Sequence, residues 1–165
     1  MTAGQIGDPI TQKRTTDFLL KARDLGLYRC ITDNGAGGVS SSVGEMAEFS
    51  GGVDIDLSKL TLKYPGLSAF ELMISESQER MTFAVDPKHL EEFLSLAVKY
   101  SIHADDIGSF TDTGLINVWY KDEIAGSLDI EFLHSGYPNM NLKAKWKGPQ
   151  TRTAWMPESS YPYKK

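Results

Sequence analysis

The stretch TDNGAGGVSSSVGEM, residues Thr32 to Met46, is richer in glycine and serine than any other part of the chain. It follows the apolar run Tyr28–Ile31, which has the composition of a short strand, and it leads into an amphipathic segment with helical spacing. A strand, a glycine turn and a helix in succession are typical of a mixed α/β domain. The turn itself could be a cradle for nucleotide phosphates, a metal site or a tight turn.

The nucleotide-binding fingerprints do not fit this turn. From Gly35 the sequence reads G-A-G-G-V-S, so Ser40 stands where the dinucleotide pattern requires glycine, and no Gly-Lys-Ser/Thr follows. Asp33 leaves the strand among backbone N–H groups, and Mg²⁺ prefers one or two carboxylates plus substrate oxygens. The start of the helix also offers N–H groups to an anion. The alternative is an Asx-turn at Asp33-Asn34 with glycines that supply positive φ, and local chemistry alone favours it.

The rest of the chain shows alternating helical and strand periodicities. They predict helices near residues 9–25, 43–50, 67–74 and 87–98, and strands near 28–32, 53–57, 81–85, 107–110, 115–120 and 124–130. This order predicts an α/β (α+β) fold in which helices surround a mixed β-sheet. In the last helix, Leu90, Phe93, Leu94, Ala97 and Val98 are expected to form one apolar face. Prolines recur after Gly136, so we expect a domain over residues 1–135 and an extended linker or tail over residues 136–165.

Composition limits the classes of function. The chain has 165 residues and a formal net charge of -5, which argues against binding to a nucleic-acid backbone. No apolar run approaches the roughly 18 residues that cross a bilayer, and the N-terminus lacks a signal peptide's apolar core. The single cysteine, Cys30, excludes an internal disulfide and favours a cytoplasmic location, and its apolar neighbours predict a buried, inert thiol. The opening GQIGDP is rich in turn residues with no element before it, as expected for the cut end of a larger protein.

Two further segments contain candidate binding residues. In ISESQERMTF, residues 74–83, five polar residues lie between apolar runs, and polar groups held close to a core need partners that a ligand can supply. The alternative is a helix-to-strand loop with surface charges. In QIGDP, Asp8 is expected to cap the following helix, whereas Gln5 has no structural role that we can assign. The histidines share no metal-ligand spacing and form no Ser/His/Asp set.

Three segments together resemble successive signatures of one enzyme family. QIGDPITQK, ITDNGAGGVSSSVGEMA and LMISESQERMTFAV are similar, in order and spacing, to those of phosphoribosylformylglycinamidine synthase (FGAM synthase). The resemblance extends from Gln5 to about Ile130, and the string SESQERM is its most specific part. It implies the C-terminal domain of the first of the enzyme's two similar halves, a domain also found in aminoimidazole ribonucleotide synthase. The implied architecture is a three-layer arrangement of helices around a mixed sheet.

The resemblance also implies a reaction and a set of site residues. In this family of ligases, ATP phosphorylates the amide oxygen of formylglycinamide ribonucleotide, and ammonia released from glutamine then displaces the phosphate. Gln5 and the triplet Glu76, Ser77 and Gln78 match substrate-binding residues, and Asp33 matches a Mg²⁺ ligand. The implied partners are the preceding ATP-binding domain, the second half of the enzyme and a glutaminase domain or subunit.

The family's catalytic histidine, its ATP-contacting lysine and its other metal-binding acids belong to the preceding domain, so no catalytic residue is assigned here. We therefore expect the isolated chain to lack synthetase activity. Two alternatives stay open at this point. One is a domain of a related ATP-dependent protein, such as a hydrogenase-maturation protein, selenide water dikinase or thiamine-phosphate kinase. The other is a stand-alone binding module that senses a purine intermediate.

Overall fold

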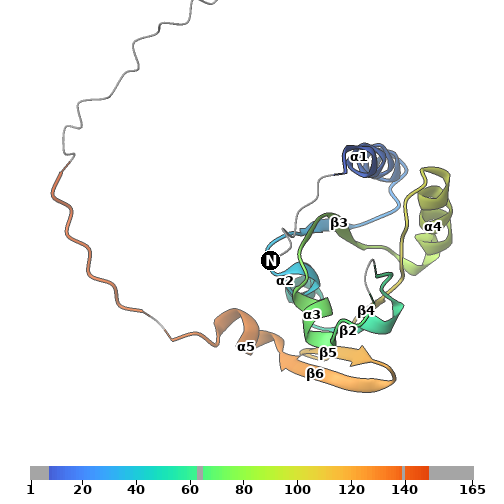
Figure 1. Ribbon diagram of the computed structural model, residues 1–165. Coiled ribbons are helices and arrows are strands. Elements are labelled where there is room, and N and C mark those ends of the chain that lie inside the picture. The colour runs from blue at the N-terminus through green and yellow to red at the C-terminus, as the bar shows by residue number, and fades with distance from the viewer. Residues whose placement is uncertain (1–7, 63–64, 139, 149–165) are drawn as a thin grey trace, which may run out of the picture.

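The computed structural model of the chain describes residues 8–62, 65–138 and 140–148. Its helices and strands follow one another in an order that mixes the two types throughout (Figure 1). In chain order they are α1 (Pro9–Asp24), β1 (Cys30–Asn34), α2 (Gly38–Ser50), β2 (Val53–Asp56), the 3₁₀ turn η1 (Leu57–Lys59), α3 (Ala69–Ile74), β3 (Ser77–Ala84), the 3₁₀ turn η2 (Pro87–His89), α4 (Leu90–Lys99), β4 (Gly108–Phe110), β5 (Leu115–Tyr120), β6 (Glu123–Asp129) and α5 (Ile130–Ser135).

Local sequence signals set several of the helix ends. The Asp8 side chain accepts hydrogen bonds from the backbone N–H groups of Ile10 and Thr11 at 3.1 and 3.3 Å, so the predicted cap of α1 is confirmed. Gly51 ends α2 at φ 86°, a left-handed conformation that favours glycine. Ser68 and Glu71 form a reciprocal capping box at the start of α3. The hydrogen bonds from the backbone and hydroxyl of Ser68 lower the pKa of the Glu71 carboxyl.

The strands form two sheets. β1 and β3 make an antiparallel pair, and the four-stranded sheet has the order β4-β2-β5-β6. Within the larger sheet β2 and β5 run parallel, whereas the β2–β4 and β5–β6 pairs are antiparallel. The expected α/β class with helices around mixed β-structure is confirmed, and the structure adds the division of the strands between two sheets.

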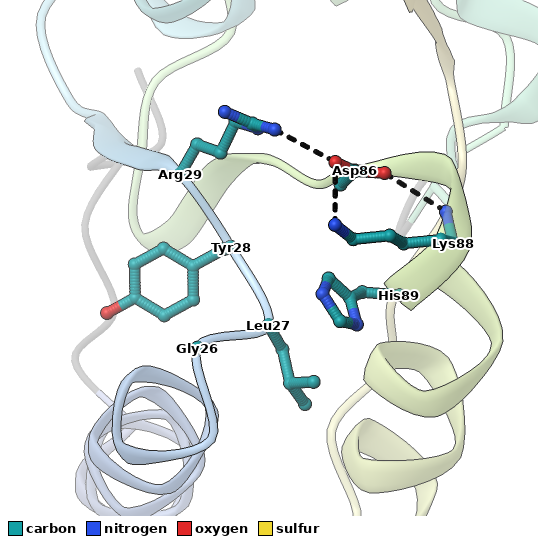
Figure 2. A pocket seen from close by; sticks show the side chains of 7 residues that line it. All are labelled: Gly26, Leu27, Tyr28, Arg29, Asp86, Lys88 and His89. Atoms are coloured by element: carbon teal, nitrogen blue, oxygen red, sulfur yellow. Dashed lines mark hydrogen bonds and ion pairs between the residues drawn. The ribbon is translucent and has the colours of Figure 1, made fainter.

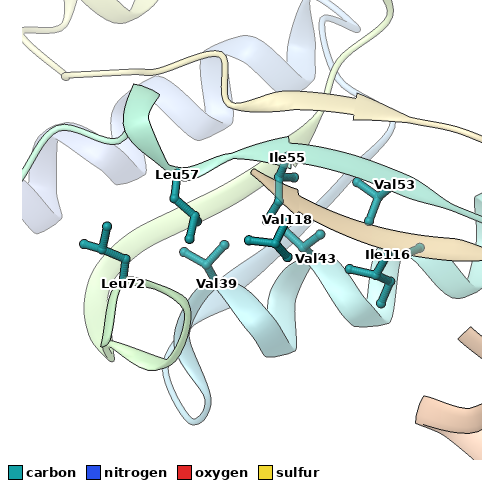
Figure 3. Packing of buried hydrophobic residues seen from close by; sticks show 9 residues of the cluster. Val39, Val43, Val53, Ile55, Leu57, Leu72, Ile116 and Val118 are labelled. Carbon is teal, nitrogen blue, oxygen red and sulfur yellow. The ribbon is translucent and has the colours of Figure 1, made fainter. Parts of the chain in front are cut away.

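Helix α2 lies between the two sheets and is buried on both sides. Towards the four-stranded sheet, Val39, Val43 and Ala47 pack on Val53, Ile55 and Leu57 of β2 and η1 and on Ile116 and Val118 of β5 (Figure 3). Towards the two-stranded sheet, the hydroxyl of Ser42 lies 2.9 Å from that of Thr82 in β3. The N-terminal end of α2 therefore has a position set by both sheets.

A second apolar cluster lies on the other side of β3, where α1 and α4 pack together. Phe18 of α1 is its centre, with edge-to-face contacts to Phe83 and Phe93 at centroid distances of 5.9 and 5.0 Å. Ala97 of α4 is buried in the same cluster, but Val98 is 76% exposed. The prediction that Val98 belongs to the apolar face was therefore wrong, because α1 and β3 cover only the side of α4 that carries Phe93 and Ala97.

The prediction of a buried thiol at Cys30 was also wrong. Cys30 is exposed at the first position of β1, and only Asn34 at the last position of that strand is buried. A strand with apolar neighbours still presents alternate side chains to opposite faces, and along β1 burial increases only towards Asn34, at the end opposite Cys30.

The C-terminal part carries the predicted hairpin. Lys121 and Asp122, with φ of 54° and 63°, form the tight turn between β5 and β6. Short helix α5 follows, and the described residues beyond it, which run away from the body in Figure 1, contain no helix or strand. Within the described ranges, no helix combines the length and the apolar character needed to span a membrane.

Candidate functional site

The glycine loop, residues 35–37, joins β1 to α2. Its end at Gly38 packs against the C-terminal end of α3. Gly37 and Gly38 have φ of 83° and 60°, so both adopt the left-handed conformation. A Cβ atom on Gly38 would lie 2.5 Å from the carbonyl oxygen of Ser75. Glycine is thus required at position 38 both for its backbone conformation and for the close approach of the segment after α3.

Asp33 forms the Asx-turn that local chemistry favours. Its Oδ1 accepts a hydrogen bond from the backbone N–H of Gly35 at 2.8 Å, and the side chain is exposed. No hydrogen bond within the described residues uses Oδ2, so the carboxylate keeps an oxygen that can face a cation. The described ranges contain no group of three or more His, Cys, Asp or Glu side chains able to hold a metal ion. The described residues therefore contain no complete metal site, and Asp33 could supply one carboxylate ligand at most.

Glu76 reaches the glycine loop from the other side. Its Oε1 accepts a hydrogen bond from the backbone N–H of Gly37 at 3.4 Å. Asn34 pairs with Ser77 in the β1–β3 register, so the chain directly after Glu76 runs beside the end of β1. The glycine loop and the segment Glu76-Ser77-Gln78, called the ESQ triplet below, lie far apart in the sequence. They are neighbours in the fold.

The expected loop between α3 and a strand at residue 81 is replaced by strand β3, which begins at Ser77. Pairing with β1 extends the strand backwards through the polar residues. A shift of register matches Asp33 with Met81 and Asn34 with Ser77, so residues 78–80 bulge out of the ladder. Residues 77–80 therefore form an irregular start of β3, and this part of the strand lies beside the glycine loop.

The structure brings together three of the predicted site positions, Asp33, Glu76 and Ser77, at one end of the two-stranded sheet. Gln5 lies outside the described residues. Gln78 lies on β3, but its side chain and that of Ser77 fall outside what the structure describes.

Sequence reasoning missed a polar network beneath this loop. Asn34 and Ser42 are 2% and 0% exposed, and the hydroxyl of Thr82 links them, at 2.7 Å from Asn34 Oδ1 and 2.9 Å from Ser42 Oγ. The available signal was an amide at the end of a short strand, because a buried polar side chain needs partners.

A separate hollow lies between the turn after α1 and η2 (Figure 2). Its charged groups are paired with one another: Asp86 accepts from Arg29 at 2.9 Å and from the backbone N–H of Lys88 at 3.2 Å. These hydrogen bonds, that of the Arg29 side chain foremost, lower the pKa of the Asp86 carboxyl. The ion pair between Arg29 and Asp86 connects the residue before β1 to the start of η2. Because these charged groups already have partners, we assign no ligand to this hollow.

His103 contacts Thr61 and Asp105, a combination that resembles a catalytic set. Thr61 Oγ1 and Asp105 Oδ1 lie 2.6 and 2.9 Å from the same ring nitrogen, Nε2. A proton relay needs the nucleophile and the acid on different nitrogens. The cluster therefore connects two loops, and it is no catalytic triad.

Comparison with known proteins places this arrangement in a family. The model of the family described as AIR synthase related protein, C-terminal domain, matches residues 2–121. The chain belongs to this family. The fold and the aminoimidazole ribonucleotide synthase-like C-terminal domain that the three sequence signatures predict are thereby confirmed.

Individual relatives agree with this assignment. Phosphoribosylformylglycinamidine synthase subunit PurL of Methanopyrus kandleri is 37% identical over 139 residues, which are 84% of this chain and 19% of that protein. The structure of Thermotoga maritima PurL complexed with FGAR has a TM-score of 0.79 and 26% identity, over 88% of this chain and 24% of that one. The same protein complexed with ATP gives a TM-score of 0.79 and 27% identity, over 88% and 25%. The chain thus spans about a fifth to a quarter of the length of these relatives.

Proposed function

We propose that the chain is the substrate-side domain of a phosphoribosylformylglycinamidine synthase, the ligase that uses ATP and glutamine to convert formylglycinamide ribonucleotide to its amidine in purine biosynthesis. The observation that carries the proposal is the contact between the glycine loop and the ESQ triplet, through Gly37 and Glu76. The PurL relative that was solved with FGAR supports the substrate.

The substrate contacts are assigned to Gln5, Glu76, Ser77 and Gln78. Amide, hydroxyl and carboxylate groups can fix a small polar ligand through a few directional hydrogen bonds. The register of Ser77 opposite Asn34 supports a ligand position at the rim of the glycine loop.

Asp33 is assigned as one ligand of a Mg²⁺ ion that it shares with residues of the preceding domain. Its Oδ1 holds the loop through Gly35, which leaves Oδ2 for the cation. When bound, the ion neutralises charge during phosphoryl transfer from ATP. ATP itself is assigned mainly to the preceding domain.

The working enzyme then needs parts beyond this chain: the ATP-binding domain, the second half of the synthetase and a glutaminase domain or subunit. In this proposal residues 1–135 form the domain, residues 136–165 form a linker towards the second half, and the protein acts in the cytoplasm. The isolated chain, without the preceding domain, is expected to have no synthetase activity.

Calorimetric titration of the chain with formylglycinamide ribonucleotide, with and without Mg²⁺, tests the proposal. We expect binding of the ribonucleotide that is weakened about tenfold or more in Glu76→Ala. In Glu131→Ala, a matched change of an exposed glutamate in α5, the binding should be kept. Absence of binding by the wild-type chain, or equal binding by Glu76→Ala, would overturn the assignment of the site. ATP-dependent amidine formation by the chain alone would overturn the expected inactivity.

A further inference from the structure

Strand β6 is the longer of the two edge strands of the four-stranded sheet. It has seven residues, all of them exposed, whereas β4 at the other edge has three. One side of β6 pairs with β5, and no strand within the described residues pairs with its other side. The middle of β6, residues 124–128, carries no charge, although charged side chains commonly protect sheet edges against pairing. The free side of β6 can therefore accept a further strand.

Residues 140–147, MNLKAKWK, have the alternation of a strand. Every second residue is apolar, and the residues between them are one asparagine and three lysines. This period of two places the apolar side chains on one face and the lysines on the other. In the structure the segment forms no helix or strand and its described side chains are exposed, Trp146 by 85%. Such an apolar stripe is stabilised by a surface that covers it.

Charge favours this segment as the occupant of the β6 edge. Residues 121–131 contain one lysine and four acids and have a net charge of -3. Residues 140–148 contain three lysines and no acid and have a net charge of +3. The β6 strand of a second copy is a poorer occupant, because antiparallel pairing centred on Gly126 would put each Glu123 opposite an Asp129. The edge therefore fits a basic strand better than a copy of itself.

The connection between β6 and this segment decides the direction of pairing. Helix α5 continues from β6 at the end opposite the hairpin turn (Figure 1), and its six residues span about 9 Å. The four residues from 136 to 139 reach up to about 14 Å, enough to return to the Asp129 end of β6. The Glu123 end lies about 20 Å further along the strand, beyond that reach. The segment can therefore pair along β6 only in the antiparallel direction.

The apolar stripe has a surface to cover when the segment is paired. Trp119 lies opposite Ile124 in the β5–β6 ladder, so their side chains share one face of the sheet, and Ile124 is 57% exposed. Glu123 lies opposite Tyr120 and thus on the other face. When the apolar side chains lie beside Ile124, the lysines fall on the face of Glu123. Both the apolar and the charged groups of the segment then have partners.

We propose that the free side of β6 is a docking site for residues 140–147 of the same chain, which add to the sheet as a fifth, antiparallel strand. The structure holds this segment undocked, away from the body (Figure 1). The connection of ten residues, 130–139, favours the chain's own segment over that of a second copy, because it keeps the segment at a high effective concentration beside the edge. Docking directs the chain beyond Gly148 to the hairpin turn. The inference does not depend on the proposed function.

The test is amide hydrogen exchange of β6, followed by nuclear magnetic resonance on the whole chain at two protein concentrations. Leu142→Asp interrupts the apolar stripe, and Lys145→Glu reverses one charge of the basic face. Leu142→Val keeps the stripe, and Lys99→Glu, at the exposed end of α4, is the control for a change of charge elsewhere. All three positions are exposed, so the domain should fold in every variant, and the amides of β2 report whether it does.

In the wild-type chain we expect the amides on the free side of β6 to be protected and to show nuclear Overhauser contacts with residues 140–147. Their exchange should become about tenfold faster or more in Leu142→Asp, because the apolar stripe loses its burial. It should become about threefold faster or more in Lys145→Glu, as for the loss of an exposed charge pair. In Leu142→Val and Lys99→Glu it should stay within about twofold of wild type. None of these rates should depend on protein concentration.

Rapid exchange of these amides in the wild-type chain, or unchanged exchange in Leu142→Asp, would overturn the inference. Protection that is present only at the higher concentration, together with a dimer in sedimentation equilibrium, would assign the edge to the segment of a second copy. That result would overturn pairing within one chain. The proposed function stands or falls separately, because none of these measurements involves the ribonucleotide.

Discussion

The backbone N–H of Gly37 donates a hydrogen bond of 3.4 Å to Oε1 of Glu76, across 39 positions of sequence. This contact connects the turn before α2 to the residue before β3. Helix α2, which follows the loop, is held between two sheets, and β3, which follows Glu76, is paired with β1, so both backbone segments next to the contact are anchored. The relationship makes the glycine loop and the ESQ triplet one surface.

Glu76→Ala should weaken ligand binding and leave the fold unchanged. The side chain is exposed and its hydrogen bond is long, so the free energy of unfolding should change by no more than about 0.5 kcal/mol. The loss of a ligand contact should lower the affinity for formylglycinamide ribonucleotide about tenfold or more. Urea unfolding and calorimetry measure the two effects separately. A loss of stability with unchanged affinity would mean that Glu76 serves only the loop.

Asp33→Asn should distinguish the role of Asp33 in the Asx-turn from its proposed role as a Mg²⁺ ligand. An asparagine Oδ1 can still accept from Gly35, so the Asx-turn and the melting temperature should be kept. The missing negative charge should raise the Mg²⁺ concentration needed for half-maximal turnover in the full-length synthetase. A titration of activity with Mg²⁺ measures this. A curve identical to wild type would leave Asp33 with the turn alone.

Gly38→Ala should destabilise the domain by at least about 2 kcal/mol, since it combines a left-handed backbone with overpacking. The added Cβ would lie 2.5 Å from the carbonyl oxygen of Ser75, a backbone atom that cannot move aside freely. Gly126→Ala in β6 is the matched control, because a Cβ there meets nothing within 4 Å. Urea unfolding of both variants gives the comparison. Equal stability of the two would show that the segment after α3 yields to the methyl group.

Asp86→Asn should make the free energy of unfolding depend less on pH in the acid range. The hydrogen bond from Arg29, with that from the backbone of Lys88, lowers the pKa of the Asp86 carboxyl below its ordinary value of 3.8. A lowered folded-state pKa gives stability that is fully present above the ordinary value and is lost as the pH falls through the folded one. The difference in unfolding free energy between wild type and variant should therefore shrink below about pH 4. A difference that stays constant from pH 7 to pH 2 would contradict this account.

Several features of the fold could be predicted from the sequence because they depend on neighbouring residues. Asp8 caps α1 through its own next residues, Gly51 ends α2 through its own φ, and Lys121-Asp122 turn the hairpin by themselves. The family could be predicted too, because its signatures are contiguous strings of residues that can be identified without knowledge of the fold.

What only the tertiary structure decided is which surfaces are covered and which strands pair. A periodic pattern identifies a face but not its partner, so the sequence did not predict that Val98 and Cys30 would be exposed. It did not predict that β3 begins at Ser77 either, because that start depends on pairing with β1. The network from Ser42 through Thr82 to Asn34 joins three elements that meet only after folding. The sequence alone therefore determined the local elements and the family, whereas long-range pairing determined how the site residues face one another.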